Sequence, residues 1–172
     1  RVFLSYSDDF QVHCIRPATV CGWSPRMRLD VSVNMLTWQG LKNKEMTVFG
    51  GKQIRPNIHI TDMVRVYEHF IDNPDKESGF YNAGFENISI LEIAKMIKEK
   101  LKETKITITE SNDPRSYRQN SDKLLETGFV QKYSVNDAIE DIIKKYKDGA
   151  LVESDNLYTV KWMKHLKLDQ SK

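Results

Sequence analysis

The chain alternates short strand-like segments with amphipathic segments that carry helix-start signals, and this alternation constrains its fold more than any other feature. The clearest helix begins at a capping box formed by Ser89 and Glu92 and continues with apolar residues at helical spacing to about Leu101. A strand-like segment at 105–109 follows it directly. Such alternation is typical of α/β folds, in which helices pack on a largely parallel sheet.

Similar signals predict the remaining elements. We expect the end of a helix at 1–7, strands at 10–16, 46–49 and 58–60, and helices at 31–42, 62–71, 121–128 and 134–146. Asp30, Asp62, Ser121 and Ser134 are expected to cap the four helices in turn, because their short polar side chains precede apolar periodic segments.

Composition excludes several classes of protein. With 40% hydrophobic and 29% charged residues, the 172-residue chain resembles an ordinary globular protein and not a disordered one. A net charge of +2 is too small to indicate a nucleic-acid partner, and no apolar run is long enough to predict a membrane span. No repeat or linker divides the chain, so we expect a single cytoplasmic unit over 1–172.

Common catalytic and phosphate-binding motifs are absent from the sequence. There is no Gly-x-Gly-x-x-Gly and no Gly-x-Ser-x-Gly. Gly79 and Gly84 have the spacing of a phosphate loop, but Phe85 and Glu86 follow where Lys and Ser or Thr are required. The sequence therefore predicts no self-sufficient catalytic apparatus.

Histidines and cysteines give no sign of a metal site. The four histidines occur singly, without ligand-type residues at metal-binding spacing: His13, His59, His69 and His165. Cys14 and Cys21 are expected to be reduced, buried thiols.

Two arginines stand in turn-rich segments, Arg55 within 50–56 and Arg115 within 112–117. The planar guanidinium fork suits phosphate oxygens, and a loop position would let it reach a ligand. Pairing with a surface carboxylate is the alternative for each.

Several motifs occur in series along the chain. They are Arg-Pro-Ala-Thr-Val-Cys-Gly at 16–22, Ser-Pro-Arg-Met-Arg-Leu-Asp at 24–30 with Val-Asn at 33–34, Val-Phe-Gly-Gly at 48–51, Gln-Ile-Arg-Pro at 53–56, Ile-His-Ile-Thr-Asp at 58–62, Tyr-Asn-Ala-Gly at 81–84 and Asp-Pro-Arg-Ser-Tyr at 113–117. Together they resemble the C-terminal half of the NAD-dependent epimerase/dehydratase family of nucleotide-sugar enzymes, the extended short-chain dehydrogenases. The resemblance extends to about residue 147.

This resemblance implies a set of site residues. Those expected to line the nicotinamide end of NAD or NADP, largely through backbone groups, are Pro17, Ala18, Thr19 and Val20. Those expected to bind a nucleoside-diphosphate sugar are Asn34 at the diphosphate, Phe49 at the base, and Arg55 and Arg115 as a diphosphate clamp.

Alternatives remain for two of these residues. Phe49 is equally compatible with core packing, and Asn34 with an exposed helix position. His59 and Asp62 are expected to be structural, the histidine ending a strand and the aspartate capping the next helix. Cys21 replaces a tyrosine often found in the family.

The implied fold is the C-terminal part of a Rossmann-type parallel sheet, interleaved with a small mixed α/β substrate-binding lobe. Segments 10–22 and 56–72 are assigned to the Rossmann lobe, and 23–55 and 73–148 to the substrate lobe. Residues 149–172 form a C-terminal extension, expected to pack on the chain itself or on a partner.

Family members carry a glycine-rich loop and a Tyr-x-x-x-Lys pair upstream of the matched region. No tyrosine here is followed by lysine four residues later, so we expect no catalytic residue in this chain. The fold is therefore expected to be incomplete, and the apolar faces of 10–16 and 62–71 are expected to lack partners.

The resemblance implies the substrate-binding portion of an epimerase, dehydratase or reductase that works as a homodimer. The alternatives are a non-catalytic nucleotide-sugar-binding or interaction module and a purely structural protein.

Overall fold

The computed structural model describes residues 2–110 and 115–166. Asp113 and Pro114, from the second arginine motif, therefore lie outside the described residues. In chain order the elements are η1 (Phe3–Tyr6), β1 (His13–Pro17), β2 (Thr19–Cys21), α1 (Ser32–Asn43), β3 (Glu45–Phe49), β4 (Ile54–His59), α2 (Ile60–Asp72), β5 (Gly79–Ala83), β6 (Glu86–Ser89), α3 (Ile90–Lys100), β7 (Lys105–Thr109), α4 (Asp122–Leu125), α5 (Val135–Lys147), η2 (Asp155–Leu157) and α6 (Thr159–His165).

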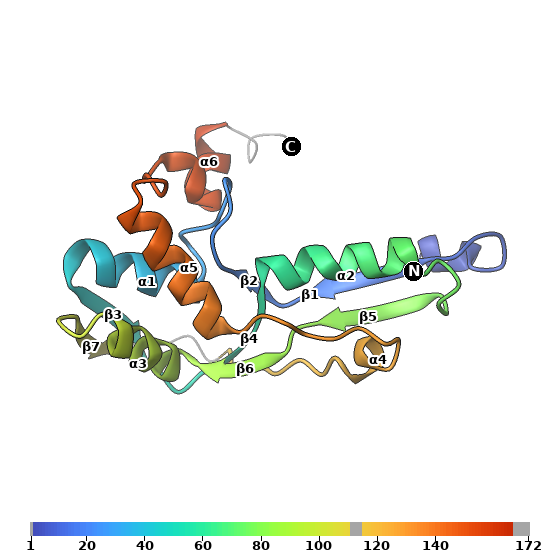
Figure 1. Cartoon of the computed structure of the whole chain (residues 1–172), viewed down its shortest axis with the longest axis horizontal. Helices are drawn as coiled ribbons and strands as arrows, with labels where there is room; N and C mark the ends of the chain where they lie inside the picture. The colour runs from blue at the N-terminus through green and yellow to red at the C-terminus, as the bar shows by residue number, and fades with distance from the viewer. Residues whose placement is uncertain (1, 111–114, 167–172) are drawn as a thin grey trace.

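The described strands form three small sheets. β1 pairs with β5 in parallel, β3 pairs with β7 in parallel, and β4 lies between β2, which is parallel to it, and β6, which is antiparallel. Three of the four strand pairs are thus parallel, with helices packed around them (Figure 1). The predicted α/β class is confirmed.

Two separate hydrophobic clusters form the core. The larger contains residues of α1, β3, α3 and α5, at the left in Figure 1. The smaller lies at the right, between α2 and the β1–β5 pair, and contains Met63, Val66 and Phe70 of α2 with Tyr81 of β5. The β2–β4–β6 sheet joins them: Cys21 belongs to the larger cluster and Ile58 to the smaller.

Several predicted elements are confirmed closely. Ser89 and Ser134 both form complete capping boxes, and the strands predicted at 46–49 and 105–109 are β3 and β7. Both capped helices have strongly amphipathic sequences with one buried face, so their local signals and their packing agree.

The helix-cap predictions for Asp30 and Asp62 are wrong. Asp30 precedes the true N-cap position, Val31, and its carboxylate instead accepts from Arg28. The cap of α2 is His59, whose Nδ1 accepts from the backbone N–H of Thr61 at 3.0 Å. Asp30 is thus engaged by a neighbouring side chain, whereas the Asp62 carboxylate is engaged by the distant backbone of 132–133.

Other boundaries also differ from prediction. The helix expected at 121–128 is the single turn α4, and Ser121 precedes it without a side-chain cap because its hydroxyl bonds to Gly84. Residues 3–6 form a 3₁₀ turn where the end of an α-helix was expected. Arg55 lies within β4 and not on a loop.

Helix α2 buries one face and exposes another. Val64, Tyr67 and Ile71 follow one helical stripe and are 48%, 51% and 76% exposed. The other edge of β1 has no strand partner among residues 2–110 and 115–166. The expectation that the apolar face of this helix lacks partners is met at Tyr67 and Ile71 but is wrong for Met63, Val66 and Phe70, which are buried in the smaller cluster.

Candidate nucleotide-sugar site

An extended segment, 115–121, crosses the edge of the central sheet and builds the candidate site; we call it the strap. The backbone N–H of Ile54 donates to the Ser116 hydroxyl at 3.0 Å, and the N–H of Tyr117 donates to the Ile54 carbonyl at 3.3 Å. Further along, the N–H of Gln119 donates to Asn87 Oδ1 at 2.8 Å. These bonds fix the strap against β4 and β6.

The strap brings the two predicted arginines together. Arg55 Nη1 donates to the backbone carbonyl of Arg115, and also to the carbonyl of Ile54 at 3.1 Å. Its guanidinium carbon lies 5.3 Å from the ring centroid of Tyr117. Cation–π contact and two carbonyl acceptors hold the guanidinium plane in place.

The strap also reaches the segment predicted to bind the cofactor. Gln119 Nε2 donates to the carbonyl of Arg16 at 2.8 Å, one residue before Pro17. Pro17 ends β1 opposite Ala83, and the N–H of Ala18 donates to the carbonyl of Ala83 at 2.8 Å. Thus one segment contacts both predicted ligand regions.

Close packing at Gly84 fixes the geometry where these segments meet. A Cβ at this position would lie 2.5 Å from the Cβ of Ala18 and 2.5 Å from Gln119 Oε1. Only glycine allows this approach. Gln119 Oε1 is buried and accepts no hydrogen bond within the part of the chain described.

Thr19 and Val20 form β2 beside β4, with Thr19 opposite Asn57 and Val20 opposite Ile58. Cys21 follows them at the position where a tyrosine is often found. Burial, followed by the charge of Glu86, raises the pKa of its thiol to about 12. Cys21 is therefore a protonated core group with no nucleophilic character.

Asn34 is buried, with 1% of its surface exposed, so the alternative of an exposed helix residue is wrong. Its Oδ1 accepts from the N–H of Gly22 at 3.0 Å, and its Nδ2 donates to the carbonyl of Arg28 at 2.9 Å. The amide therefore braces both ends of the loop between β2 and α1.

Phe49, unlike Asn34, is exposed to solvent. It ends β3 with 54% of its surface exposed, so the core-packing alternative is wrong. An exposed ring at a strand end is free to stack on a planar ligand.

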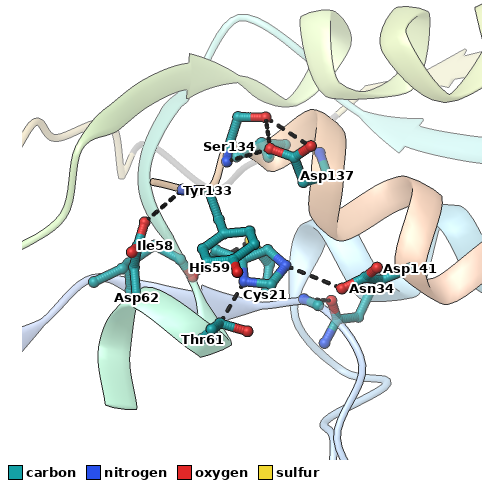
Figure 2. A network of polar contacts seen from close by, with 12 residues as sticks. Cys21, Asn34, Ile58, His59, Thr61, Asp62, Tyr133, Ser134, Asp137 and Asp141 are labelled. Atoms are coloured by element: carbon teal, nitrogen blue, oxygen red, sulfur yellow. Dashed lines mark hydrogen bonds and ion pairs between the residues drawn. The ribbon is translucent and has the colours of Figure 1, made fainter. Parts of the chain in front are cut away.

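A polar network connects β4 to α5 (Figure 2). The buried imidazole of His59 stacks on Tyr133, with ring centroids 5.0 Å apart, and its Nε2 faces Asp141 Oδ2 at 3.3 Å without a hydrogen bond. Asp62 accepts from the N–H of Tyr133 at 2.8 Å and from the N–H of Lys132 at 3.0 Å. His59 and Asp62 thus hold the linker that leads into α5.

Sequence reasoning missed the bridging role of Gln119 and Asn87, because isolated amides carry no local signature. No three potential metal ligands from His, Cys, Asp and Glu lie together within the described ranges. No helix there is long and apolar enough to span a membrane.

Comparisons with known proteins were made by sequence and by structure. No protein-family model matches the chain. It is 34% identical over 113 residues to the ADP-L-glycero-D-manno-heptose-6-epimerase of Brachyspira hyodysenteriae, a match that covers 61% of this chain and 35% of the relative.

Solved structures match a larger share of the chain. The ADP-L-glycero-D-manno-heptose-6-epimerase of Helicobacter pylori matches with a TM-score of 0.73 and 24% identity, over 85% of this chain and 48% of that one. The UDP-glucuronic acid 4-epimerase of Bacillus cereus, solved with UDP-glucuronic acid and NAD, matches with a TM-score of 0.69 and 25% identity, over 84% and 48%.

The dTDP-glucose 4,6-dehydratase of Bacillus anthracis, solved with NAD, has a TM-score of 0.70 at 21% identity, over 86% and 49%. The chain thus spans about half the length of these solved structures and about a third of the curated relative. The resemblance to the NAD-dependent epimerase/dehydratase family is therefore confirmed, and the chain corresponds to part of that fold.

Proposed function

We propose that this chain is the substrate-binding portion of an NAD(P)-dependent nucleotide-sugar epimerase or dehydratase. The contact between Arg55 and Arg115 carries the proposal, because it places two predicted phosphate-binding residues at one point of the surface. The bond from Gln119 to Arg16 supports it, because the same strap reaches the proposed cofactor segment.

The arrangement suits a nucleoside diphosphate linked to a sugar. Arginine side chains complement the oxygens of a diphosphate, and the Arg55 side chain meets the backbone of Arg115. The contacts of Arg55 with Tyr117 and Ile54 limit the entropy lost when it binds. The exposed ring of Phe49 supplies a surface for the base. Asn34 contributes through the loop that its amide holds, not through free polar atoms of its own.

The residues of 17–20 are suited to the nicotinamide end of NAD(P), which supplies hydride transfer when bound. The bond from Gln119 to the carbonyl of Arg16 and the close approach of Gly84 to Ala18 support this assignment, because both fix the backbone of this segment. In the proposed role, this chain orients the sugar and the nicotinamide ring and excludes water between them.

The family that this chain resembles transfers protons with a Tyr-x-x-x-Lys pair. No tyrosine here is followed by lysine at the fourth position, so the acid–base pair of the proposed reaction must come from other polypeptide. The exposed stripe of Val64, Tyr67 and Ile71 supports this, because it offers an apolar face to a further lobe. The homodimer implied by the family resemblance remains a prediction.

Calorimetric titration with UDP-, dTDP-, GDP-, CDP- and ADP-sugars tests the proposal. We expect one of these classes to bind, and Arg55→Ala and Arg115→Ala each to weaken binding at least about tenfold, as loss of a charge-assisted hydrogen bond does. Lys102→Ala, an exposed cation after α3, is the control and should leave affinity unchanged. Binding that is insensitive to both arginine substitutions would contradict the proposed site.

The missing acid–base pair favours a second candidate, a binding module that serves a separate catalytic subunit. Incubation of the 172-residue chain with NAD and the bound sugar nucleotide separates the two roles. Product formation by this chain alone would rule out a binding-only role and would also show that the proton donor lies within it.

A further inference from the structure

The segment 150–159, in the C-terminal extension, packs into the body of the protein. Leu157 is 4% exposed, and it joins Leu151 in the larger hydrophobic cluster. Glu153 forms an ion pair with Lys42 of α1 and accepts from the Tyr158 hydroxyl at 2.5 Å. The segment is thus anchored by both apolar and polar contacts.

This segment is bonded directly to the loop between β2 and α1. The backbone N–H of Leu29 donates to the carbonyl of Leu157 at 2.8 Å. Beside Leu29, Asp30 is paired with Arg28: although burial acts in the opposite direction, the hydrogen bond and the charge of Arg28 hold the pKa of the Asp30 carboxyl below its ordinary value.

From this loop the contacts continue to the end of β2. Arg28 Nε donates to Asp30 at 2.8 Å, and the Arg28 carbonyl accepts from Asn34 Nδ2. The Oδ1 of Asn34 then accepts from the N–H of Gly22, which has a φ of 104° directly after β2. One series of hydrogen bonds therefore runs from the C-terminal segment to the strand of Thr19 and Val20.

Buried and exposed residues alternate along this loop. Met27 and Leu29 are buried in the larger cluster, whereas Arg26 and Arg28 are exposed. Between Gly22 and Val31 the loop contains no helix or strand. Its conformation therefore depends on contacts with other segments.

We infer that residues 150–159 act as a clasp that fixes the loop 22–31 and thereby sets the turn at Gly22, two residues after the proposed cofactor-binding segment 17–20. The ligand part of this inference rests on the proposed function. The positioning residues are Leu157, which anchors the clasp and accepts from the N–H of Leu29, and Asp30, which pairs with Arg28 within the loop. Neither is assigned a contact with substrate.

Hydrogen exchange of the full 172-residue chain tests the clasp without any ligand. Leu157→Ala should accelerate exchange at the amides of Leu29 and Gly22 at least about tenfold, and Leu157→Met should restore most of the protection. Met163→Ala, on the exposed side of the neighbouring α6, is the control and should change neither amide.

The amide of Ile142, in the buried core of α5, serves as the internal reference for global unfolding. Equal acceleration at Ile142 would reduce the effect to a general loss of stability and would overturn the inference. Unchanged exchange at Gly22 would also overturn it. Asp30→Asn, a partly exposed substitution, gives a second test: it should loosen the amide of Leu29 and leave Ile142 unchanged.

Titration with the best-binding sugar nucleotide separates this inference from the proposed function. With an intact site, Leu157→Ala should weaken binding about fivefold or more, while Met163→Ala binds like the original chain. Absence of binding by the original chain would sink the proposed function, yet the exchange result would still decide the clasp. Undiminished binding by Leu157→Ala would sink its role in positioning the site.

Discussion

Arg55 and Arg115 stand 60 positions apart in the sequence, yet the guanidinium of the first donates to the backbone carbonyl of the second. One lies in the strand β4 and the other at the start of the strap. The ring of Tyr117 lies against the same guanidinium. The plane of the Arg55 guanidinium is therefore set by contacts with the strap.

This geometry predicts that charge alone does not replace Arg55. Arg55→Lys keeps the positive charge but loses the planar fork, so it should recover less than half of the binding free energy that Arg55→Ala loses. Calorimetry with the preferred sugar nucleotide measures this. Full recovery by lysine would show that the site requires only a positive charge.

At Gly84 we expect strong intolerance of a methyl group. Gly84→Ala places a Cβ 2.5 Å from both Ala18 and Gln119, and should lower the free energy of unfolding by about 1–3 kcal/mol. Gly79→Ala is the matched control, because its Cβ would meet the movable end of Lys123 at 2.8 Å. Urea denaturation distinguishes the two, and equal effects would argue against a close approach at Gly84.

Two substitutions of His59 separate its capping of α2 from the stacking of its ring on Tyr133. His59→Asn retains an acceptor that suits a helix N-cap, whereas His59→Ala removes it. Both lose the stack on Tyr133, so His59→Asn should be the more stable by about 1 kcal/mol in chemical denaturation. Equal stability of the two variants would mean that Nδ1 does not cap α2.

Acid should weaken the clasp through Glu153. Hydrogen bonds from Lys42 and then Tyr158 hold the pKa of this carboxyl below its ordinary value. A carboxyl with a lowered pKa stabilises the fold above its unfolded-state pKa, and this contribution is lost as the pH falls through its folded-state pKa.

Glu153→Gln should therefore lower the melting temperature at about pH 7 and have little effect at about pH 3. Thermal denaturation of both proteins across this range measures the difference. Other acidic groups are common to both proteins and cancel in the comparison. A melting-temperature difference that stays constant with pH would contradict the assignment.

The sequence predicted elements best where local and tertiary signals coincide. Ser89 and Ser134 have their capping partners three residues away, so both helix starts are visible in the sequence. Asp30 and Asp62 carry the same local signal, but Arg28 and the backbone of 132–133 bind their carboxylates in the folded chain. Arg28 is a neighbour of Asp30 in the sequence, but the partners of Asp62 lie 70 and 71 positions away and cannot be inferred from spacing.

Within the candidate site, motif order identified Arg55 and Arg115, which the structure brings together. Periodicity did not show that Asn34 is buried or that Phe49 is exposed, because both properties depend on segments distant in the chain. Gln119, which ties the strap to Arg16, has no sequence signal at all.

The presence of two hydrophobic clusters has a consequence for how the protein opens. Because α5 and α2 lie in different clusters, connected through the β2–β4–β6 sheet and the contacts of His59 and Asp62, we expect each cluster to be able to lose its structure while the other persists. Amide exchange under mild denaturant should then resolve two cooperative units of different free energy. A ligand that contacts both would merge them, so binding would be visible as a gain in unfolding cooperativity.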